Sequence, residues 1–321
     1  MTDPAGPPDE LAWRPGSAGQ IAGLLAGVSY LADEHACGVL WLAAQLGRPV
    51  LVEGPAGTGK TELAVSLAAA TGRRLIRLQC YEGLDEARAL FEWNHSRQLL
   101  RIVAEQVSRA SRPGPPGPPG VPAEASVFTE EFLLTRPLLD AIRAAEPVVL
   151  LIDEVDRLDV ETEALLLEVL SDYQVSIPEL GTVTGRQVPP VFLTSNSSRD
   201  LSEALRRRCL YLYLDYPPTE REREIVRTRV PGVPEHLAAQ IAAFAGSLRR
   251  LDLRQRPSVA QTLEWARTLL ALGAQDLDAG LAAESLPVLL GYRSDLDLAA
   301  AELAAAQLSG GQLSGGSLSG G

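Results

Sequence analysis

Apolar and polar positions follow two patterns along the chain, and these patterns predict an α/β region followed by an all-helical one. Short apolar runs predict buried strands. Longer runs with helical spacing separate these strands, and from residue 217 onward only helical patterns occur. The predicted strands are PVLVEG (49–54), RRLIRLQC (73–80), EPVVLLIDE (146–154), VFLTSN (191–196) and YLYLDYP (211–217). This alternation predicts a parallel sheet covered by helices, with a small helical domain behind it in the sequence.

The predicted helices cover most of the remaining chain. We expect helix from residue 17 to 47, in 61–72, from 84 to 106 with interruptions, and in 128–145, 160–173 and 201–209. Four further helical patterns occupy 219–230, 235–251, 258–273 and 277–291. In the segment 174–190, apolar and polar residues alternate, and Pro and Gly interrupt the alternation. This pattern predicts a β-hairpin.

Domain boundaries follow from the changes in composition. Residues 1–16 are acidic and Pro-rich and predict a disordered tail, and residues 307–321 predict a flexible Gly/Ser-rich tail. The α/β domain then spans 17–216 and the helical domain spans 217–306. Within the first domain, PGPPGPPG (113–120) predicts an exposed loop or semi-rigid linker.

Composition narrows the possible partners and compartments. Of the 321 residues 46% are hydrophobic, and the net charge is −12, which argues against a nucleic-acid binder without excluding a local basic groove. Three widely spaced cysteines, without CxxC or Cys/His spacing, predict reduced and partly buried thiols. We see neither a signal-peptide pattern nor an apolar run long enough for a membrane span, so we expect a cytoplasmic protein.

One segment matches the G-x-x-x-x-G-K-[ST] pattern of a phosphate-binding loop, between a predicted strand and a predicted helix. Glycines allow the backbone N–H groups to surround a phosphate, and the next helix offers its N-terminus to the anion. The lysine would reach the β- and γ-phosphates of ATP, and the threonine hydroxyl would bind Mg²⁺. The alternative is a Gly-rich turn without a ligand. The residues are Gly54, Pro55, Ala56, Gly57, Thr58, Gly59, Lys60 and Thr61.

Two adjacent acids end the apolar strand 148–152. Asp153 would hold Mg²⁺ directly or through water, and Glu154 would act as general base for the attacking water. The bland alternative is a strand end with two solvated acids. The chain shows no Asn/Thr-Lys-x-Asp segment for reading guanine, which favours ATP over GTP.

Two further polar segments complete the candidate chemistry. Asn196 ends the strand VFLTSN, where it could reach the γ-phosphate or the attacking water, or could simply form a turn. An arginine of the cluster Arg206-Arg207-Arg208 could stabilise charge on the transferring phosphoryl group, and such an arginine can act from a neighbouring subunit. Otherwise these arginines form a solvated basic helix end.

In this order, the four motifs resemble those of AAA+ ATPases over roughly residues 17–290. More narrowly, the chain resembles the MoxR group and its CoxD-like branch. The segments that carry this resemblance are YLADEHACGVLWLAAQLGRPVLVEGPAGTGKTELA, FEWNHSRQLLRI, YQVSIPELGTVTGRQVPPVFLTSNSSRDLSEALRRRCLYLYLDYP and RPSVAQTLEWARTLLALG.

The resemblance implies a P-loop AAA+ αβα parallel-sheet domain followed by a small all-helical lid domain, with ATP and Mg²⁺ as ligands. It also implies a ring oligomer, a hexamer, with a helix-2 insert at about 91–128 and a pre-sensor I hairpin at about 174–190. Asn196 would be the sensor I residue, and by position Arg208 would be the arginine finger, with Arg207 as the second choice. Such proteins act as ATP-dependent chaperones that remodel or mature metal enzymes, often with a partner that carries a von Willebrand factor A domain. For the CoxD-like branch, the client would be a carbon monoxide dehydrogenase-like molybdenum hydroxylase.

One position departs from the family pattern. Where many MoxR relatives read P-S-P-R at the start of a lid helix, this chain reads Pro257-Ser258-Val259-Ala260. Arg254, Arg256 or no residue at all would fill the sensor II role. Two other functions stay open: an AAA+ ATPase that acts on nucleic acid, of the clamp-loader or restriction-motor type, and a nucleotide-regulated scaffold that barely hydrolyses ATP.

Overall fold

A computed structural model describes residues 13–110, 127–178 and 180–308. The Pro-Gly loop 113–120 and most of both predicted tails lie outside the described residues. The chain folds into two compact units. The first unit comprises residues 1–21, 34–52 and 64–212, and the second comprises 22–33, 53–63 and 213–321.

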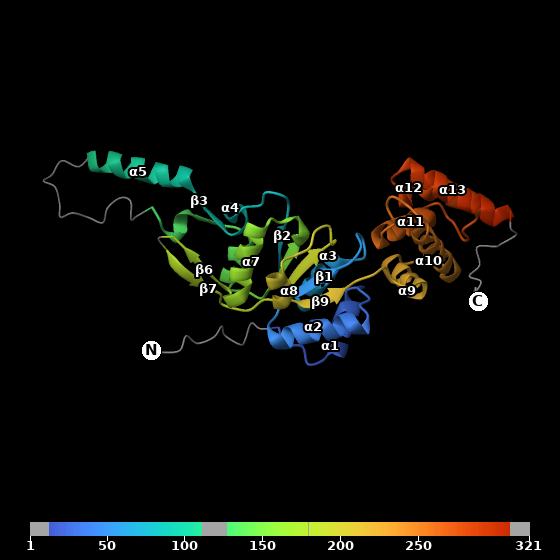
Figure 1. Cartoon of the computed structure of the whole chain (residues 1–321), viewed down its shortest axis with the longest axis horizontal. Helices are drawn as coiled ribbons and strands as arrows, with labels where there is room; N and C mark the ends of the chain where they lie inside the picture. The colour runs from blue at the N-terminus through green and yellow to red at the C-terminus, as the bar shows by residue number, and fades with distance from the viewer. Residues whose placement is uncertain (1–12, 111–126, 179, 309–321) are drawn as a thin grey trace. The chain divides into compact units, whose positions relative to one another are not determined.

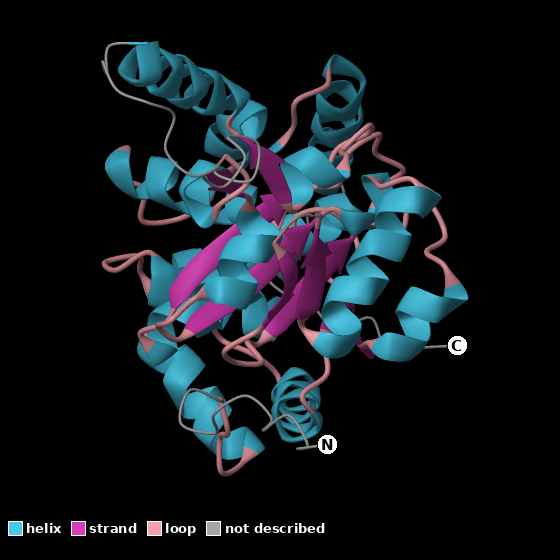
Figure 2. Cartoon of the chain, turned by 90° about the vertical axis from the view of Figure 1, so that its left-hand side faces the viewer, coloured by secondary structure: helices cyan, strands magenta, loops and turns pink. Residues whose placement is uncertain are grey.

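A five-stranded sheet forms the centre of the first unit, in the order β2-β5-β8-β1-β9. β5 pairs in parallel with β2 on one side and with β8 on the other. All residues of β5 and β8 are buried, as expected for strands covered on both faces. The prediction of five strands is therefore confirmed, and Figure 2 shows the strands between helices. Their bounds are β1 Val50–Glu53, β2 Arg74–Gln79, β5 Val148–Asp153, β8 Val191–Ser195 and β9 Leu210–Tyr213.

Helices with apolar faces bury the sheet and form one core cluster with it. α6 packs on β2 and β5 through side chains such as Leu138, Leu139 and Ile142. α7 adds Leu166, and Asp159 caps its N-terminus by accepting from the Thr162 N–H. The helices that begin before residue 217 are α1 Ala18–Gly27, α2 Glu34–Leu46, α3 Lys60–Thr71, α4 Glu86–Ala89, α5 His95–Ala110, α6 Pro137–Arg143, α7 Val160–Asp172 and α8 Glu203–Arg208.

The helical prediction is wrong in part of two segments, 84–106 and 128–145. In the structure, β3 (Phe91–Trp93) pairs antiparallel with β4 (Leu133–Thr135), and a short 3₁₀ helix, η2 (Glu130–Phe132), precedes β4. Each strand has only three residues, too few for a period-2 pattern to stand out from helical spacing. Pairing between segments far apart in the sequence decides the outcome, because it buries Phe91 and Leu133.

The alternating segment 174–190 forms a hairpin of β6 (Gln174–Ile177) and β7 (Gly181–Thr184). Tyr173, which ends α7, has a left-handed backbone with φ of 47°. Its carbonyl accepts from the Gly185 N–H at 2.7 Å, which closes the base of the hairpin. Val175 and Ile177 are buried in the core cluster of the first unit.

The C-terminal part of the second unit is all-helical, as predicted, and Figure 1 colours its helices from orange to red. Trp265 is fully buried at its centre and donates its indole N–H to Ser285 at 2.8 Å. One helix more than the four predicted patterns is present, α13, which follows a short turn. The bounds are α9 Thr219–Arg229, α10 Glu235–Arg250, α11 Val259–Ala271, α12 Ala279–Leu289 and α13 Arg293–Leu308.

None of the helices among the described residues is long and apolar enough to cross a bilayer. The three cysteines are buried and form no disulfide with one another, in line with the reduced thiols predicted from their spacing.

Candidate nucleotide-binding and hydrolysis site

The glycine-rich segment Gly54–Thr61 forms a tight loop in the second unit, between β1 and α3. Gly54, Gly57 and Gly59 have φ values of 151°, 79° and 93°, which side-chain-bearing residues rarely adopt. Lys60 is buried at the first position of α3 and donates from Nζ to the carbonyls of Gly54 at 2.8 Å and Pro55 at 2.7 Å. The ammonium group therefore lies against the inside of the loop.

Two of the glycines are also required by close approach of neighbouring backbone. A Cβ at Gly54 would lie 1.9 Å from the carbonyl oxygen of Leu214, and one at Gly57 would lie 2.1 Å from Cβ of Ser258. The loop is thus packed between the segment after β9 and the start of α11. Its shape depends on contacts that the motif itself does not contain.

Residues of the helical region also bind two carbonyl groups of the loop. The Tyr216 hydroxyl donates to the Ala56 carbonyl at 3.1 Å, and the Val259 N–H donates to the Gly57 carbonyl at 3.0 Å. Burial raises the pKa of Tyr216, so its hydroxyl keeps the proton that it donates. With these carbonyls held on one side, the peptide N–H groups are left for an anion.

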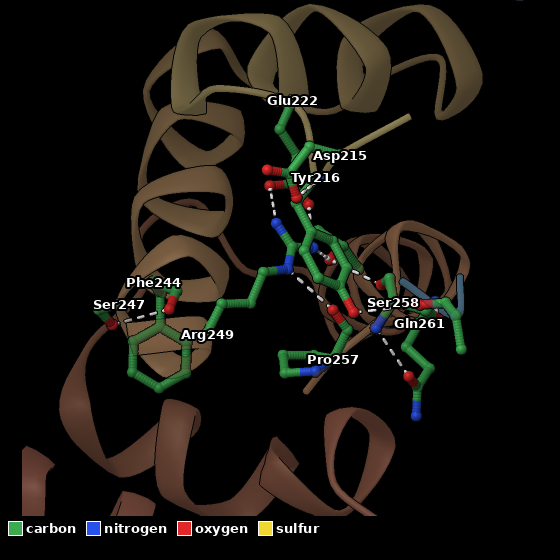
Figure 3. A network of polar contacts seen from close by, with 11 residues as sticks. Asp215, Tyr216, Glu222, Phe244, Ser247, Arg249, Pro257, Ser258 and Gln261 are labelled. Atoms are coloured by element: carbon green, nitrogen blue, oxygen red, sulfur yellow. Dashed lines mark hydrogen bonds and ion pairs between the residues drawn. The ribbon is translucent and has the colours of Figure 1, made fainter. Parts of the chain in front are cut away.

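Tyr216 belongs to a buried network around Arg249 of α10, which Figure 3 shows from close by. The Arg249 guanidinium makes a bidentate ion pair with Glu222 of α9, at 2.6 and 2.7 Å, and donates to the Pro257 carbonyl at 2.8 Å. It also lies 4.5 Å from the centroid of the Tyr216 ring. One arginine thereby joins α9, α10, the residue before α11 and the tyrosine that contacts the loop.

The two arginines considered for sensor II differ in their surroundings. Arg254 stacks over the Tyr292 ring at 4.4 Å, and its N–H donates to Asp295 at 3.0 Å. Arg256 is exposed and close enough to Tyr216 for its charge to lower the pKa of that hydroxyl against the larger effect of burial.

In the first unit, the acids Asp153 and Glu154 end β5 in different surroundings. Asp153 is buried, and its carboxylate accepts from the Thr194 hydroxyl and from Arg77 at 2.5 Å. Glu154 has a left-handed backbone, with φ of 58°, and its N–H donates to the Thr194 hydroxyl oxygen at 2.9 Å. A left-handed conformation is uncommon for a residue with a side chain and needs such support.

The Glu154 carboxylate is more exposed and has two partners. Its Oε2 accepts from Nε2 of Gln79 at 3.1 Å and from Nε of Arg157 at 2.9 Å. Gln79 is the residue paired with Asp153 across the parallel ladder of β2 and β5. Asp153 is therefore buried and held by Thr194 and Arg77, while the more exposed Glu154 can leave its partners at little cost.

The loop after β8 carries Asn196 on the surface, beyond the buried Thr194 and Ser195. Asp156 holds this loop, because its carboxylate accepts from the N–H and hydroxyl of Ser198 at 3.0 and 2.6 Å. Burial works to raise the pKa of Asp156, but the hydrogen bonds from Ser198 and Asn196 outweigh it and lower the pKa. The ionised form of this acid therefore orients the segment with Asn196.

Arg207 and Arg208 lie in the last turn of α8. Arg207 is exposed and pairs with Glu203 of the same helix at 2.6 Å. Ser202 caps the N-terminus, and its own N–H donates to the buried Glu163 of α7 at 3.0 Å. The helix thus presents both arginines next to a buried cysteine, Cys209, whose pKa burial raises to about 12.

The structure brings the predicted residues together in two groups. The first unit contains the acids, Asn196, Arg207 and Arg208, and the second contains the glycine-rich loop with Lys60 and Thr61. Sequence reasoning missed the roles of Thr194, Arg77, Gln79 and Tyr216. For Gln79 a signal was present, because it ends a predicted strand just as Asp153 does.

The residues present fit a magnesium ion bound together with ATP. The first unit offers the carboxylate of Asp153 and the second offers the hydroxyl of Thr61, and both are oxygen donors of the kind that Mg²⁺ prefers. In the described part of the chain, no group of three or more His, Cys, Asp and Glu could hold a metal ion.

Comparisons with known proteins identify the class. A family model described as an AAA domain of the dynein-related subfamily matches residues 49–209, half of the chain. The chain belongs to this family: it is an AAA+ ATPase, an enzyme that hydrolyses ATP with Mg²⁺.

Three relatives place the chain more narrowly within the AAA+ ATPases. It is 26% identical to the denitrification regulatory protein NirQ of Stutzerimonas stutzeri, over 68% of this chain and 70% of that protein. It is 27% identical to the protein NorQ of Paracoccus denitrificans (strain Pd 1222), over 85% and 93%, and 28% identical to the gas vesicle ATPase GvpN of Haloferax mediterranei, over 66% and 59%. The chain is thus an AAA+ ATPase of MoxR-like type, which confirms that part of the resemblance.

Among solved structures, the chain is similar to the Holliday junction branch migration motor RuvB of Thermotoga maritima. The match has a TM-score of 0.43 and 16% identity and covers 86% of this chain and 72% of RuvB. Similarity at this level says nothing about function.

Proposed function

We propose that this ATPase is a remodelling chaperone that assists the maturation of a metal enzyme or the insertion of its cofactor. The client class that we propose is a carbon monoxide dehydrogenase-like molybdenum hydroxylase, in line with the resemblance to the CoxD-like branch. The proposal is supported by the similarity to NirQ, which is named a denitrification regulatory protein, and to NorQ, of which the match covers 93%. The cytoplasm is the compartment that we propose for this work.

The hydrolytic part of the proposal rests on one observation: Asp153 and Glu154 lie in different surroundings. Asp153 pairs with Arg77 and is buried beside Thr194, which suits a metal-binding acid. Glu154 emerges from the same strand end on a left-handed residue and stays partly exposed. A carboxylate that can leave its partners can take a proton from an attacking water.

The other roles follow from residue chemistry. The N–H groups of Gly54–Gly59 would bind phosphate oxygens, and Lys60 would exchange its two carbonyl partners for the β- and γ-phosphates. Thr61 and Asp153 would hold Mg²⁺, which neutralises charge on the phosphates when bound. Asn196 would orient the attacking water, and we favour Arg256 over Arg254 for the sensor II role.

We also propose that the active form is a ring, a hexamer, in which Arg208 serves the neighbouring subunit's site. Arg207 is the second choice, because its side chain already pairs with Glu203. The insert at 91–128 and the hairpin at 174–190 would contact the client, and a protein with a von Willebrand factor A domain would act as partner.

The segment FEWNHSRQLLR is the best candidate in this chain for binding nucleic acid, and its surroundings argue against a nucleic-acid motor. In FEWNHSRQLLR, Trp93 makes edge contacts with Phe91 and Phe128, with centroids 6.4 and 5.3 Å apart. Arg97 donates to Glu131 at 3.2 Å. Rings that pack edge-on against one another do not offer their faces as a platform for stacked bases.

A trapping experiment tests the proposal. Glu154→Gln should bind ATP without turning it over, so that ATP-bound assemblies accumulate on client and partner in the native host. Lys60→Ala should fail to bind ATP tightly and is the matched control. We expect a molybdenum hydroxylase and the von Willebrand factor A protein to co-purify with Glu154→Gln and not with Lys60→Ala.

Two outcomes would contradict it. Equal recovery of the proteins with both variants would remove the link to ATP. Submicromolar affinity for single- or double-stranded DNA at physiological salt, with no client enriched, would favour the nucleic-acid motor.

A further inference from the structure

An arginine far away in the sequence binds the end of the helix that carries Arg207 and Arg208. Nε of Arg48 donates to the carbonyl of Arg208 at 3.0 Å. Its Nη2 donates to the carbonyl of Arg207 and, at 3.3 Å, to that of Cys209. The last carbonyls of a helix have no partner within it, so one guanidinium satisfies three consecutive acceptors at the end of α8.

The backbone of Arg48 is fixed before its side chain reaches α8. α2 ends at Leu46 and is followed by Gly47, with φ of 61°, and the Arg48 N–H donates to the Ala43 carbonyl at 3.1 Å, as in a Schellman motif. The next residue, Pro49, accepts from the N–H of Leu210, the first residue of β9, at 2.8 Å. The guanidinium therefore starts from a rigid point beside the strand that follows α8.

A charged side chain also holds the other end of α8. Glu163 of α7 is buried and accepts from the Ser202 N–H at the N-cap. An acid at the N-terminus and an arginine at the C-terminus both complement the helix dipole. With only six residues, α8 is too short to be stable alone, so these two contacts help to fix its direction together with the buried Leu205.

Arg208 depends on this direction more than Arg207 does. Arg207 is tied to Glu203 on its own helix, whereas none of the carboxylates in the described ranges forms an ion pair with Arg208. The direction of the Arg208 side chain therefore depends on its backbone. Arg48 holds that backbone by donating to the Arg208 carbonyl.

We propose that Arg48 is a positioning residue for the arginine that α8 presents to the neighbouring subunit. The inference rests on the proposed function, because it requires Arg208 to act in trans. The alternative is that Arg48 supports the nucleotide site of its own chain, since it precedes β1 and the glycine-rich loop in the sequence. The two roles differ in which subunit's site fails when Arg48 is replaced.

Mixed assemblies of inactive variants separate these roles. Arg48→Met removes the donors and keeps a long side chain, next to a cavity of about 480 Å³ that leaves room for it. Alone, it should bind fluorescent ATP like the unchanged protein and turn ATP over about 10- to 100-fold more slowly, the loss expected for a misplaced catalytic group. Mixed with Lys60→Ala, it should recover activity, because its intact sites then face a well-positioned Arg208. Mixed with Arg208→Ala, it should not recover, because neither subunit donates a working arginine.

The opposite pattern overturns the inference. Recovery with Arg208→Ala and none with Lys60→Ala would mean that Arg48 supports its own nucleotide site. Loss of folding or of the assembly in Arg48→Met would make Arg48 a fold-stabilising residue and would equally overturn it. Arg48→Lys, which keeps a cation at the helix end, should have intermediate turnover and the same mixing pattern.

Two controls complete the design. Arg74→Met removes an arginine of the same unit that pairs with Asp140 and Glu146, and it should leave turnover and mixing unchanged. The mixture of Arg208→Ala with Lys60→Ala tests the trans arginine itself. If that mixture stays inactive although it co-assembles, the trans role in the proposed function has failed; if it recovers while the Arg48→Met mixtures do not follow the expected pattern, only the inference about Arg48 has failed.

Discussion

Each of the two units contains an arginine–carboxylate contact beside a candidate site, and the two contacts are built differently. Arg249 and Glu222 are 7% and 1% exposed, and the arginine has further partners in Pro257 and Tyr216. Arg157 and Glu154 are 56% and 31% exposed and share a single contact of 2.9 Å. A fully desolvated pair cannot be broken without leaving a charge in a dry interior, whereas a half-exposed pair exchanges its partner for water. The first therefore serves structure, and the second suits an acid that has to move.

The largest effect is expected when Glu154 is replaced, and it should lower turnover without lowering stability. Glu154→Gln should lower turnover by about 10²- to 10⁴-fold, the usual loss for a general base, because the amide cannot accept the proton of the attacking water. ATP binding and the free energy of unfolding should change little. Steady-state turnover, nucleotide titration and chemical denaturation measure the three quantities, and lost binding with normal turnover per bound site would contradict the assignment.

The second largest effect is expected at the buried pair of Arg249 and Glu222. Arg249→Met should lower the free energy of unfolding by about 3–5 kcal/mol, because Glu222 is left buried without a partner. Denaturant titration of the variant measures this loss. The double variant Arg249→Met/Glu222→Leu should recover much of it, and a single variant with unchanged stability would show that water reaches this pair.

A smaller effect concerns the contact between the helical region and the glycine-rich loop. Tyr216→Phe removes the hydroxyl that donates to Ala56 and keeps the ring under Arg249. One hydrogen bond contributes about 0.5–1.5 kcal/mol, so ATP affinity should fall by roughly 2- to 10-fold with little change in stability. Fluorescent-nucleotide binding measures this. An unchanged affinity together with reduced stability would assign the hydroxyl to folding alone.

The smallest effect is expected at the exposed pair. Arg157→Met should change the free energy of unfolding by less than about 1 kcal/mol, as for other surface ion pairs, and should leave ATP binding intact. Turnover should stay equal or rise, since Glu154 then has one partner fewer to leave. A loss of turnover as large as that of Glu154→Gln would mean that Arg157 takes part in the reaction.

Local patterns were sufficient for some parts of the fold and not for others. The strand at 148–153 and the helices after residue 217 were predictable, because long apolar runs and helical periodicity are properties of consecutive residues. The strands Phe91–Trp93 and Leu133–Thr135 were not, since three-residue strands exist only through pairing between distant segments. The same holds for Gln79, whose partner Glu154 is brought to it by the register of two parallel strands.

By itself, the sequence determined the kinds of groups available: a loop of glycines with a lysine and a threonine, two acids at the end of a buried strand, and two arginines at the end of a short helix. These are local features, and their chemistry is contained in the residue types and their spacing. Only the tertiary structure decided how each group is held. Tyr216 and Val259 bind the loop carbonyls, Thr194 supports the left-handed Glu154, and Arg48 binds the end of α8, in each case across 40 or more positions of sequence. A hydrogen bond between distant residues leaves no periodic trace in a sequence, because its partners become neighbours only when the core between them is packed.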